Sequence, residues 1–464
     1  MRYISTRGLA PPVSFLDAVL GGLAPDGGLY VPETWPRLGV DVLAAAATAP
    51  YVETAAQVLH AFAGDDLTLT QCRAMAQDAY GDQWANAAIC PLRQIGPGEW
   101  LLELFHGPSL AFKDVAMQLL APLFDHALAA RDARLAVVCA TSGDTGGAAV
   151  EALRRSSRVD LFVLLPKGRV SDVQRRFMTA SGAANVFAIE VDGDFDAAQG
   201  VVKALFADRD FATEVALSPV NSINWARVLA QAAYYVTSAA ALAAAGPVRF
   251  TVPTGNFGDA LAGDVARRLG APVGEIRLAT NANDSLTTAL ETGVFAAPSH
   301  SAATISPAMD VTAASNFERI VFEAVGRDAG TLRGLYAAFA QGRRFEIPAP
   351  ALAALRAGFS GARADDAATR AAMIEAKALT GEVLCPHTAV GWSGRLTGGT
   401  GARVLLATAH PAKFPETVEA VLGAPPAPPP AAIAVMGRAE VATDLPAEPG
   451  AVKAFIRAHS RAAA

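Results

Sequence analysis

Lys113 is the residue best suited to covalent chemistry. It follows three apolar residues and precedes Asp114 in residues 103–114 (ELFHGPSLAFKD), and it is one of only six lysines, at positions 113, 167, 203, 377, 413 and 453. An apolar environment disfavours the charged ammonium, so the pKa falls and the neutral amine becomes nucleophilic. Such an amine forms a Schiff base with an aldehyde cofactor. The alternative is an ordinary surface lysine at a helix start, paired with Asp114.

Residues 251–259 (TVPTGNFGD) have the composition of a strand-to-helix turn that binds an anion. Gly255 and Gly258 allow the main chain to approach a ligand closely, and the helix that follows presents the positive end of its dipole. Successive N–H donors of this kind suit a cofactor phosphate. The segment is neither a Walker loop nor a GxGxxG motif, and a plain glycine turn is the alternative.

Two further segments combine polar side chains with a predicted helix start. Residues 141–147 (TSGDTGG) offer the hydroxyls of Thr141, Ser142 and Thr145 as a site for a carboxylate or phosphate, or else an N-cap by Ser142 or Asp144.

The second segment is residues 221–227 (NSINWAR), which open a long alanine-rich helix. Asn221 and Ser222 fit an N-cap role, and Arg227 lies about one turn inside the helix, where its planar guanidinium can reach a phosphate. Capping alone explains Asn221 and Ser222 equally well. The combination with the other two turns favours anion binding.

Alternating strands and helices must position these turns. We expect strands at residues 135–140, 159–165, 186–191, 248–252, 276–279 and 403–407, with helices at residues 148–155 and 196–207. Continuous apolar strands separated by helices predict parallel sheets covered on both faces, an α/β architecture of the open, doubly wound kind. Ligands then bind at the carboxyl ends of the strands. Residues 226–245 are alanine-rich and carry Arg227 and Gln231, which indicates a buried core helix rather than a membrane span.

The predicted organisation has four segments. Residues 1–90 form a mostly helical N-terminal lobe, and residues 91–245 form an α/β lobe that carries Lys113 and the SGDTG loop. Residues 246–422 form a second α/β lobe with the GNFG loop and Thr408. Residues 423–464 are a Pro/Ala-rich linker (GAPPAPPP at residues 423–430) and a tail that caps the fold or stays mobile.

Composition excludes several classes of protein. The 464 residues are 52% hydrophobic and 18% charged, with a net charge of −6, which is incompatible with wholesale disorder and gives no basic surface for nucleic acid or anionic membrane. The four cysteines lie far apart and the histidines show no zinc-ligand spacing, so we expect no metal and a reducing compartment. The first residues (MRYISTRGL) contain no signal-like apolar stretch, and we therefore expect a cytoplasmic protein.

Five motifs together resemble the threonine synthase family of fold-type II pyridoxal 5'-phosphate (PLP) enzymes. They are FHGPSLAFKD, SGDTG, NSINWAR, PTGNFGD and ATAHPAKF (residues 407–414), in the family's order. TRG near the start and LAPDGGLYVP (residues 23–32) are similar to the long bacterial and fungal branch. The resemblance covers most of residues 1–420 and leaves out the tail after Leu422.

The resemblance implies a role for each matching residue. Lys113 would bind the PLP aldehyde covalently, and Thr408 would hydrogen-bond the pyridine nitrogen. Asp144 would lie near the phenolic oxygen, where many relatives have asparagine. The PLP phosphate would be bound by Gly255, Asn256, Phe257 and Gly258. The substrate's carboxylate and phosphate would be bound by Thr141, Ser142, Thr145, Asn221, Ser222 and Arg227.

The implied reaction converts O-phospho-L-homoserine and water to L-threonine and phosphate, with Lys113 as the base that removes the Cα proton. A monomer and a homodimer are both compatible with the sequence. A serine/threonine dehydratase or cysteine synthase would leave Arg227 without a partner, because its substrate carries no phosphate. A phosphate lyase that releases 2-oxobutyrate would use the same binding groups. A non-catalytic relative that kept the fold for binding or signalling would not need Lys113.

Overall fold

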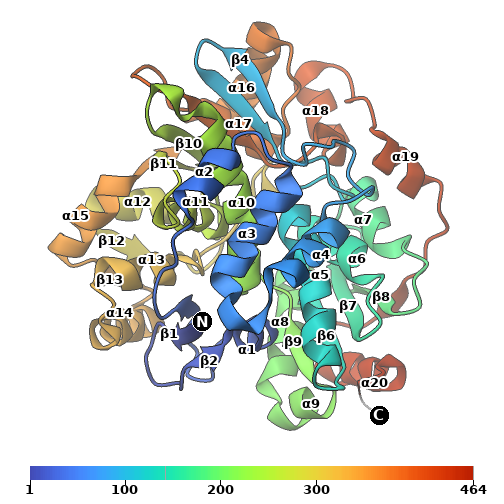
Figure 1. Cartoon of the computed structure of the whole chain (residues 1–464). Helices are drawn as coiled ribbons and strands as arrows, with labels where there is room; N and C mark the ends of the chain where they lie inside the picture. Colours follow the sequence, from blue (N-terminus) through green and yellow to red (C-terminus); the bar gives the residue numbers. More distant parts are fainter. Residues whose placement is uncertain (142, 463–464) are drawn as a thin grey trace.

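The computed structural model describes residues 1–141 and 143–462 (Figure 1). The N-terminal part contains a small antiparallel sheet in the order β2-β1-β3, formed by β1 (Arg2–Ser5), β2 (Val13–Ser14) and β3 (Tyr30–Pro32). Its helices are α1 (Phe15–Gly21), α2 (Val40–Ala45), α3 (Tyr51–Ala63) and α4 (Leu69–Ala79), with a short 3-10 turn at Gly64–Asp66. Helices make up most of this part, and the small sheet was not predicted from the sequence.

A six-stranded sheet has the order β14-β11-β10-β15-β5-β4. Its strands are β4 (Leu92–Gly96), β5 (Glu99–Glu103), β10 (Val248–Pro253), β11 (Val273–Thr280), β14 (Phe359–Arg363) and β15 (Arg403–Ala407). Each neighbouring pair is parallel except β4 and β5, which form an antiparallel hairpin at the edge. The carboxyl ends of β10 and β15 are therefore neighbours, and each leads into one of the predicted cofactor loops.

A five-stranded sheet has the order β16-β8-β7-β6-β9, and all its pairs are parallel. Its strands are β6 (Leu135–Ala140), β7 (Val159–Pro166), β8 (Val186–Val191), β9 (Leu217–Pro219) and β16 (Thr443–Leu445). All eight residues of β7 are buried, as expected for a strand covered on both faces. The predicted α/β class with doubly wound parallel sheets is confirmed.

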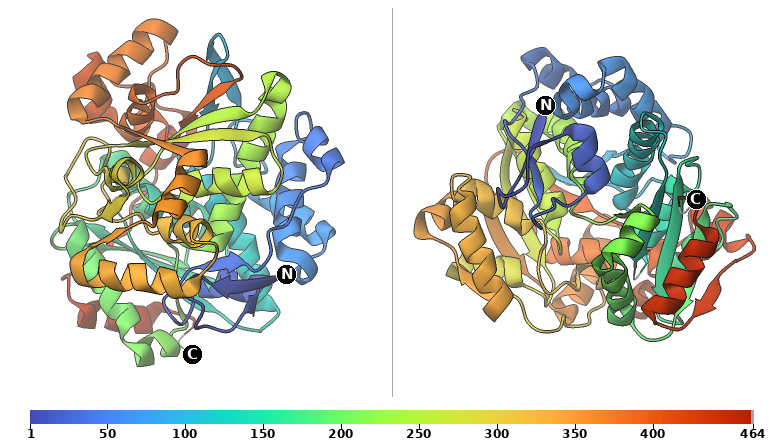
Figure 2. Two further views of the ribbon diagram at one scale, coloured as in Figure 1. Left: turned by 90° about the vertical axis from the view of Figure 1, so that its left-hand side faces the viewer. Right: turned by 90° about the horizontal axis from the view of Figure 1, so that it is seen from below.

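Helices cover both sheets (Figures 1 and 2). Those of the first half are α5 (Lys113–Ala129), α6 (Asp144–Leu153), α7 (Asp172–Thr179), α8 (Phe195–Ala207), α9 (Arg209–Glu214) and α10 (Trp225–Leu242). Those of the second half are α11 (Gly258–Arg268), α12 (Ser285–Thr292), α13 (Phe317–Ala324), α14 (Ala329–Gly342), α15 (Ala349–Gly358), α16 (Asp366–Thr380), α17 (Pro386–Ser393), α18 (Pro415–Leu422), α19 (Pro430–Met436) and α20 (Pro449–His459). A two-stranded antiparallel sheet of β12 (Val294–Ala296) and β13 (Arg344–Glu346) and the 3-10 turns Ala243–Ala245, Pro307–Met309 and Pro411–Lys413 complete the described elements.

Helix α10 is the central helix of the molecule. It packs against α3 of the N-terminal part, α5 beside the five-stranded sheet and α11 beside the six-stranded sheet. With its 3-10 extension it is long and apolar enough to cross a membrane, but 61% of the apolar window is buried within the fold. The prediction of a core helix is confirmed, because the apolar surface of α10 is covered by protein on several sides.

The predicted segment boundaries do not follow the sheets in two places. The hairpin β4–β5 was assigned to the lobe of residues 91–245, but β5 pairs with β15 in the other sheet. The tail was expected to cap the fold or stay mobile; β16 pairs with β8, and α20 packs on α8 (Figure 2, right). The tail thus completes the five-stranded sheet. The division into four segments otherwise stays a prediction.

Candidate active site

Lys113 is the first residue of α5 and lies beside the end of β15. The preceding loop is held by backbone hydrogen bonds from Phe112 N to Thr408 O (2.8 Å) and from His410 N to Leu110 O (3.0 Å). Leu110 has a positive φ of 64°, which is unusual for a leucine and marks a loop whose shape is imposed by its surroundings. The base of the lysine side chain is thereby fixed relative to Thr408.

The Lys113 amine lies in a buried site, with 12% of its side chain exposed, and its Nζ is 3.8 Å from Asp144 Oδ2. Burial lowers the pKa of Lys113 to about 8, with Lys413 and Arg227 acting in the same direction and Asp144 opposing them. Asp114 does not pair with Lys113. Its carboxylate accepts hydrogen bonds from Ser109 N (2.9 Å) and Ser109 Oγ (2.6 Å), so it braces the preceding loop. The alternative of a surface lysine paired with Asp114 is therefore wrong.

The loop of residues 255–258 joins β10 to α11. Within the described residues, its four backbone amides donate no hydrogen bond to the protein. Phe257 has a φ of 62°, in the left-handed region, and no side chain caps the N-terminus of α11. The amides are therefore free to bind an anion at the positive end of the helix dipole. A Cβ on Gly255 would lie 2.5 Å from Val311 Cγ2 and 3.0 Å from Met309 Cα, which explains why this position needs glycine.

Thr408 directly follows β15, the strand that pairs with β10. Its backbone is fixed, since its N–H donates to Thr388 Oγ1 (3.1 Å). Its own hydroxyl is buried, and no partner for it exists among the described residues. An unpartnered buried hydroxyl is costly, and a ligand atom that hydrogen-bonds it would remove that cost.

The loop after β6 carries Thr141, Thr145 and Asp144; Ser142 lies outside the described residues. Thr141 Oγ1 accepts hydrogen bonds from Gly143 N and Gly146 N, both at 3.0 Å. This bracing starts α6 at Asp144, four residues before the predicted helix start. The N–H groups of Gly143 and Gly146 point to Thr141 and are therefore not available to a ligand.

The loop after β9 begins α10 differently from the prediction. The N-cap is Asn224, whose Oδ1 accepts from Ala226 N (3.0 Å) and whose Nδ2 donates to Val19 O (2.7 Å). The predicted N-cap role of Asn221 and Ser222 is wrong. Both lie one turn earlier and are half-buried. They remain available as candidate ligand-binding residues, apart from Asn221 Oδ1, which accepts from Ile223 N (3.2 Å).

Arg227 is buried and carries an unpaired guanidinium. No carboxylate in the described part of the chain forms an ion pair with it, and its Nε has no hydrogen-bond partner there. Burial lowers its pKa to about 10, which still leaves it charged at neutral pH. An uncompensated buried cation is unfavourable, so an anionic ligand is the natural partner for this group.

Asn316 and Arg319 connect two of these loops. Asn316 donates from its N–H to Asn256 O (3.2 Å) and from its amide to Ser222 O (2.9 Å). The fully buried Arg319 donates to Asn316 Oδ1, to Ile223 O and to Tyr30 O. Asn316 and Arg319 thus connect the loop of residues 221–227 with the loop of residues 255–258 through one cluster of hydrogen bonds. Neither residue was predicted, because their partners are distant in sequence.

Lys413, Gln174 and His387 are further site residues that sequence reasoning missed. Lys413 is 1% exposed and binds Asp144 Oδ1 at 2.8 Å, and Gln174 Nε2 donates to the same oxygen at 2.9 Å. Burial lowers the pKa of His387 to about 4 and keeps the ring neutral. The scarcity of lysine was a signal for Lys413. The other two gave none.

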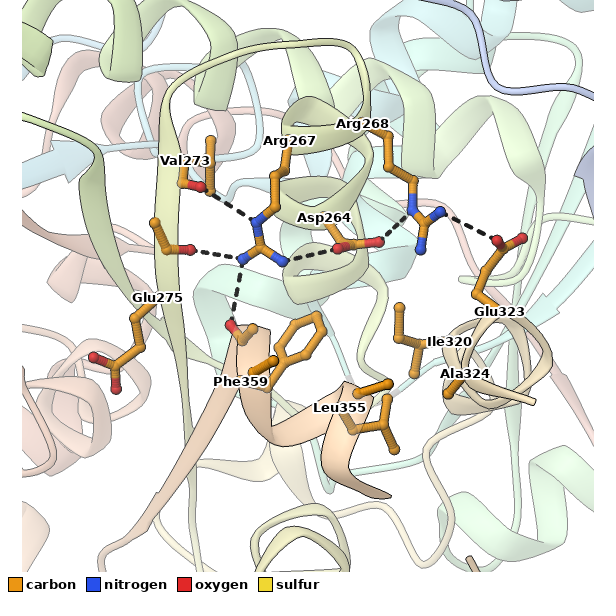
Figure 3. Close-up of a pocket in the computed structure, with 14 residues that line it drawn as sticks. Asp264, Arg267, Arg268, Val273, Glu275, Ile320, Glu323, Ala324, Leu355 and Phe359 are labelled. Atoms are coloured by element: carbon orange, nitrogen blue, oxygen red, sulfur yellow. Dashed lines mark hydrogen bonds and ion pairs between the residues drawn. The ribbon is translucent and has the colours of Figure 1, made fainter. Parts of the chain in front are cut away.

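A hollow of about 520 Å³ lies in another part of the molecule, between α11, α13 and α15 (Figure 3). Its charged groups are paired with one another: Arg267 donates to Val273 O, Gly274 O and Asp264, and Arg268 contacts Asp264 and Glu323. None of the predicted site residues lines it. We therefore do not assign this hollow to the active site.

The residues at the strand ends fit PLP. The amides of residues 255–258 match a phosphate, the unpartnered Thr408 hydroxyl matches a ring nitrogen, and Lys113 supplies the amine for the aldehyde. A family model described as "Pyridoxal-phosphate dependent enzyme" matches residues 89–388. The chain is thus a PLP-dependent enzyme with the fold-type II architecture.

Within that class, the chain belongs to the threonine synthase family. Models described as "Threonine synthase N terminus" and "Threonine synthase, C-terminal" match residues 2–80 and 388–456. The second match extends the likeness beyond Leu422, so the expectation that the tail lies outside the family is wrong. The family consists of lyases that catalyse the last step of threonine biosynthesis.

Individual relatives agree over the whole chain. A threonine synthase of Pseudomonas aeruginosa is 43% identical in an alignment of 464 positions that covers 99% of this chain and 98% of the relative. A PLP-bound threonine synthase crystal structure from Brucella melitensis superposes with a TM-score of 0.96 at 46% identity, covering 99% of this chain and 100% of that one. A yeast threonine synthase structure gives a TM-score of 0.92 at 30% identity, covering 99% and 98%.

Proposed function

We propose that this chain converts O-phospho-L-homoserine and water to L-threonine and phosphate at the site around Lys113. The observation that carries the substrate assignment is the buried guanidinium of Arg227, which has no ion-pair partner among the residues that the structure describes. A substrate with two anionic ends, a carboxylate and a phosphate ester, supplies the missing counter-charge. A dehydratase substrate without phosphate offers one anionic group fewer.

The cofactor is held mainly by neutral groups in this proposal. The amides of residues 255–258 bind the PLP phosphate, Thr408 donates to or accepts from the pyridine nitrogen, and Asp144 lies near the phenolic oxygen. When bound, PLP withdraws electrons from the substrate and so makes its Cα and Cβ protons acidic. Support for these roles comes from the free amides and the unpartnered hydroxyl.

Thr141, Ser142, Thr145, Asn221, Ser222 and Arg227 bind the substrate's two anionic groups. The Arg227 guanidinium can form two parallel hydrogen bonds to a phosphate or carboxylate. Asn316 holds the backbone of Ser222 and of Asn256 at the same time, so substrate and cofactor loops keep one spacing. Such fixed spacing is what orientation of a substrate against a cofactor requires.

Lys113 acts as the base in this proposal. Its Nζ, uncharged once substrate has displaced it from the cofactor, removes the Cα proton. A pKa of about 8 places this amine near the operating pH, where a general base is most effective. A second proton leaves Cβ, phosphate departs from Cγ, and Cγ takes up a proton. Water then adds its hydroxyl at Cβ, and return of a proton to Cα completes threonine. Burial of the amine limits unwanted proton exchange with solvent.

Incubation with O-phospho-L-homoserine tests the reaction when phosphate and threonine are followed together. We expect both to appear in equal amounts. Phosphate accompanied by 2-oxobutyrate and ammonia instead of threonine would make the chain a phosphate lyase. No phosphate release would contradict the substrate assignment itself.

We also infer a cytoplasmic enzyme, a monomer or homodimer, that binds neither nucleic acid nor membrane. The net charge of −6 and four buried, unpaired cysteines support this setting. Within the described residues, no cluster of His, Cys, Asp and Glu is arranged to hold a metal ion. Light scattering at several protein concentrations decides between monomer and dimer.

A further inference from the structure

Two lysines compete for one buried carboxylate in this site. Asp144 Oδ1 lies 2.8 Å from Lys413 Nζ, whereas Asp144 Oδ2 lies 3.8 Å from Lys113 Nζ. The first separation is a charge-assisted hydrogen bond, and the second is too long for one. Asp144 is 5% exposed at its side chain, so water contributes little to either pair. The carboxylate of Asp144 therefore interacts more strongly with Lys413 than with Lys113.

We propose that Lys413 is a positioning residue for Lys113: its ammonium takes the hydrogen bond of Asp144, which weakens the interaction of that carboxylate with the Lys113 amine and so favours the uncharged amine. The proposal rests on the proposed function, because an uncharged Lys113 is needed to bind the cofactor aldehyde. Lys413 acts through Asp144 and is not itself the reacting amine.

The contacts of Lys413 are those of an ammonium group. Its Nζ donates to Ser109 O (2.8 Å) as well as to Asp144, and both acceptors suit an ammonium with three N–H donors. Gln174 Nε2 donates to Asp144 Oδ1, and nearby Lys113 and Lys413 hold the pKa of Asp144 well below its usual range despite burial. Lys413 and Asp144 thus form a buried ion pair.

The other groups around Lys113 act in the same direction or are neutral. Arg227 on α10 adds a second positive charge that disfavours an ammonium at Lys113. His387 on α17 is neutral, because burial lowers its pKa to about 4. Asp114 on the same helix is turned to Ser109, and burial raises its pKa to about 6. Apart from Asp144, no carboxylate in the described residues pairs with Lys113.

A purely structural role explains Lys413 less well. The loop it contacts is already fastened by Phe112 N to Thr408 O, by His410 N to Leu110 O and by the bridge between Ala111 and Ala409. Burying an ion pair where an apolar side chain would pack is seldom stabilising. The positive charge of Lys413, rather than its contact with the loop, is therefore the feature that a functional role must explain.

The test is the pH dependence of PLP attachment to the full-length chain freed of cofactor. Neutral Lys113 adds its lone pair to the aldehyde carbon, both amine protons leave with the aldehyde oxygen as water, and borohydride fixes the product for peptide mass spectrometry. Attachment rates from roughly pH 6 to roughly pH 10.5 give a titration midpoint for the amine. We expect about 8 in the unmodified chain.

K413M should raise that midpoint by about 1–2 units, because Asp144 is released to Lys113. Near neutral pH this reduces the attachment rate by roughly 10- to 100-fold. K413R keeps the charge and should restore the original midpoint. The control K167M, which removes a surface lysine paired with Asp444, should leave the midpoint unchanged. A K413M midpoint that stays the same or falls would overturn the proposal.

A second pair of variants covers the case in which K413M fails to fold because Asp144 is left buried. D144N should lower the midpoint, and K413M/D144N, which removes both charges, should bring it back up. Equal midpoints in these two variants would overturn the role of the Lys413 charge. If the unmodified chain attaches PLP at another lysine, the function assigned to Lys113 fails instead, and the two failures are distinguishable.

Discussion

The two sheets contribute chemically different halves of the site. The six-stranded sheet supplies backbone amides at residues 255–258 and the hydroxyl of Thr408, all uncharged. The five-stranded sheet and α10 supply Asp144 and Arg227, both buried and charged. Amides at a helix start bind an anion without the cost of burying a side-chain charge. Such amides suit a cofactor that stays bound. A substrate with two anionic groups must leave water at each turnover, and a buried cation that has no partner in the free enzyme favours its binding.

Removal of Lys113 should have the largest effect, because this residue serves both the cofactor and the substrate. In Lys113→Ala we expect no borohydride-reducible chromophore and a fall in kcat of at least about 10²–10⁴-fold, since the covalent attachment and the base are both lost. The fold should persist, because the amine makes only a long ion pair with Asp144. Absorbance, borohydride reduction and steady-state kinetics measure this. Turnover at the unmodified rate would refute the assignment, and Lys167→Ala serves as control.

Replacement of Arg227 should separate substrate binding from cofactor binding. Arg227→Met removes a charge-assisted interaction of about 1.5–3 kcal/mol, so KM for O-phospho-L-homoserine should rise roughly 10- to 150-fold while PLP affinity is retained. Equal loss of both affinities would make Arg227 structural.

The same substitution should leave the melting temperature unchanged or raise it, because the buried guanidinium has no partner in the described protein. Arg319→Met is the matched control. Arg319 is equally buried but donates to Asn316, Ile223 and Tyr30, so its loss leaves these acceptors unpaired and should destabilise the fold by about 1–3 kcal/mol or more. Calorimetry of the two variants without substrate measures both melting temperatures. It thereby compares a buried arginine that binds a ligand with a buried arginine that stabilises the fold.

An added methyl group in the phosphate loop should affect mainly the neutral half. Gly255→Ala places a Cβ 3.0 Å from the main-chain Cα of Met309, so the loop must move. We expect PLP affinity to fall by about 10-fold, a shift of about 1.4 kcal/mol, with a smaller effect on KM once PLP is saturating. Gly200→Ala in helix α8 meets no atom within 4 Å and should be neutral or slightly stabilising. Unchanged PLP binding in Gly255→Ala would argue against the amide cradle.

Much of this arrangement could be predicted from local sequence. The strands Leu135–Ala140, Val186–Val191 and Arg403–Ala407 have the predicted bounds, because continuous apolar runs between turn residues specify buried parallel strands. The loops that follow β6, β10 and β15 carry the motif residues, and their convergence follows from parallel topology.

What escaped prediction depends on contacts distant in sequence. The start of α6 is set by Thr141, which turns its hydroxyl to two amides, and the start of α10 is set by Asn224, which also reaches Val19. Local capping preferences do not distinguish Asn224 from Asn221, because both are asparagines ahead of the same helix. The pairing of Lys413 with Asp144 spans the two halves of the chain, and only the folded structure brings the two residues together.

The smallest effect should come from the Thr408 hydroxyl. Thr408→Val keeps the shape and removes Oγ1, a buried atom without a hydrogen-bond partner in the described protein. The cofactor-free chain should therefore be as stable as before or slightly more so, while PLP affinity falls about 2- to 10-fold, equivalent to roughly 0.5–1.5 kcal/mol for one neutral hydrogen bond. Thr408→Ser retains the hydroxyl and should keep PLP affinity close to the original. A Thr408→Val chain that is destabilised without PLP would mean that the hydroxyl serves the fold, and the neutral half would then lack its contact to the cofactor ring.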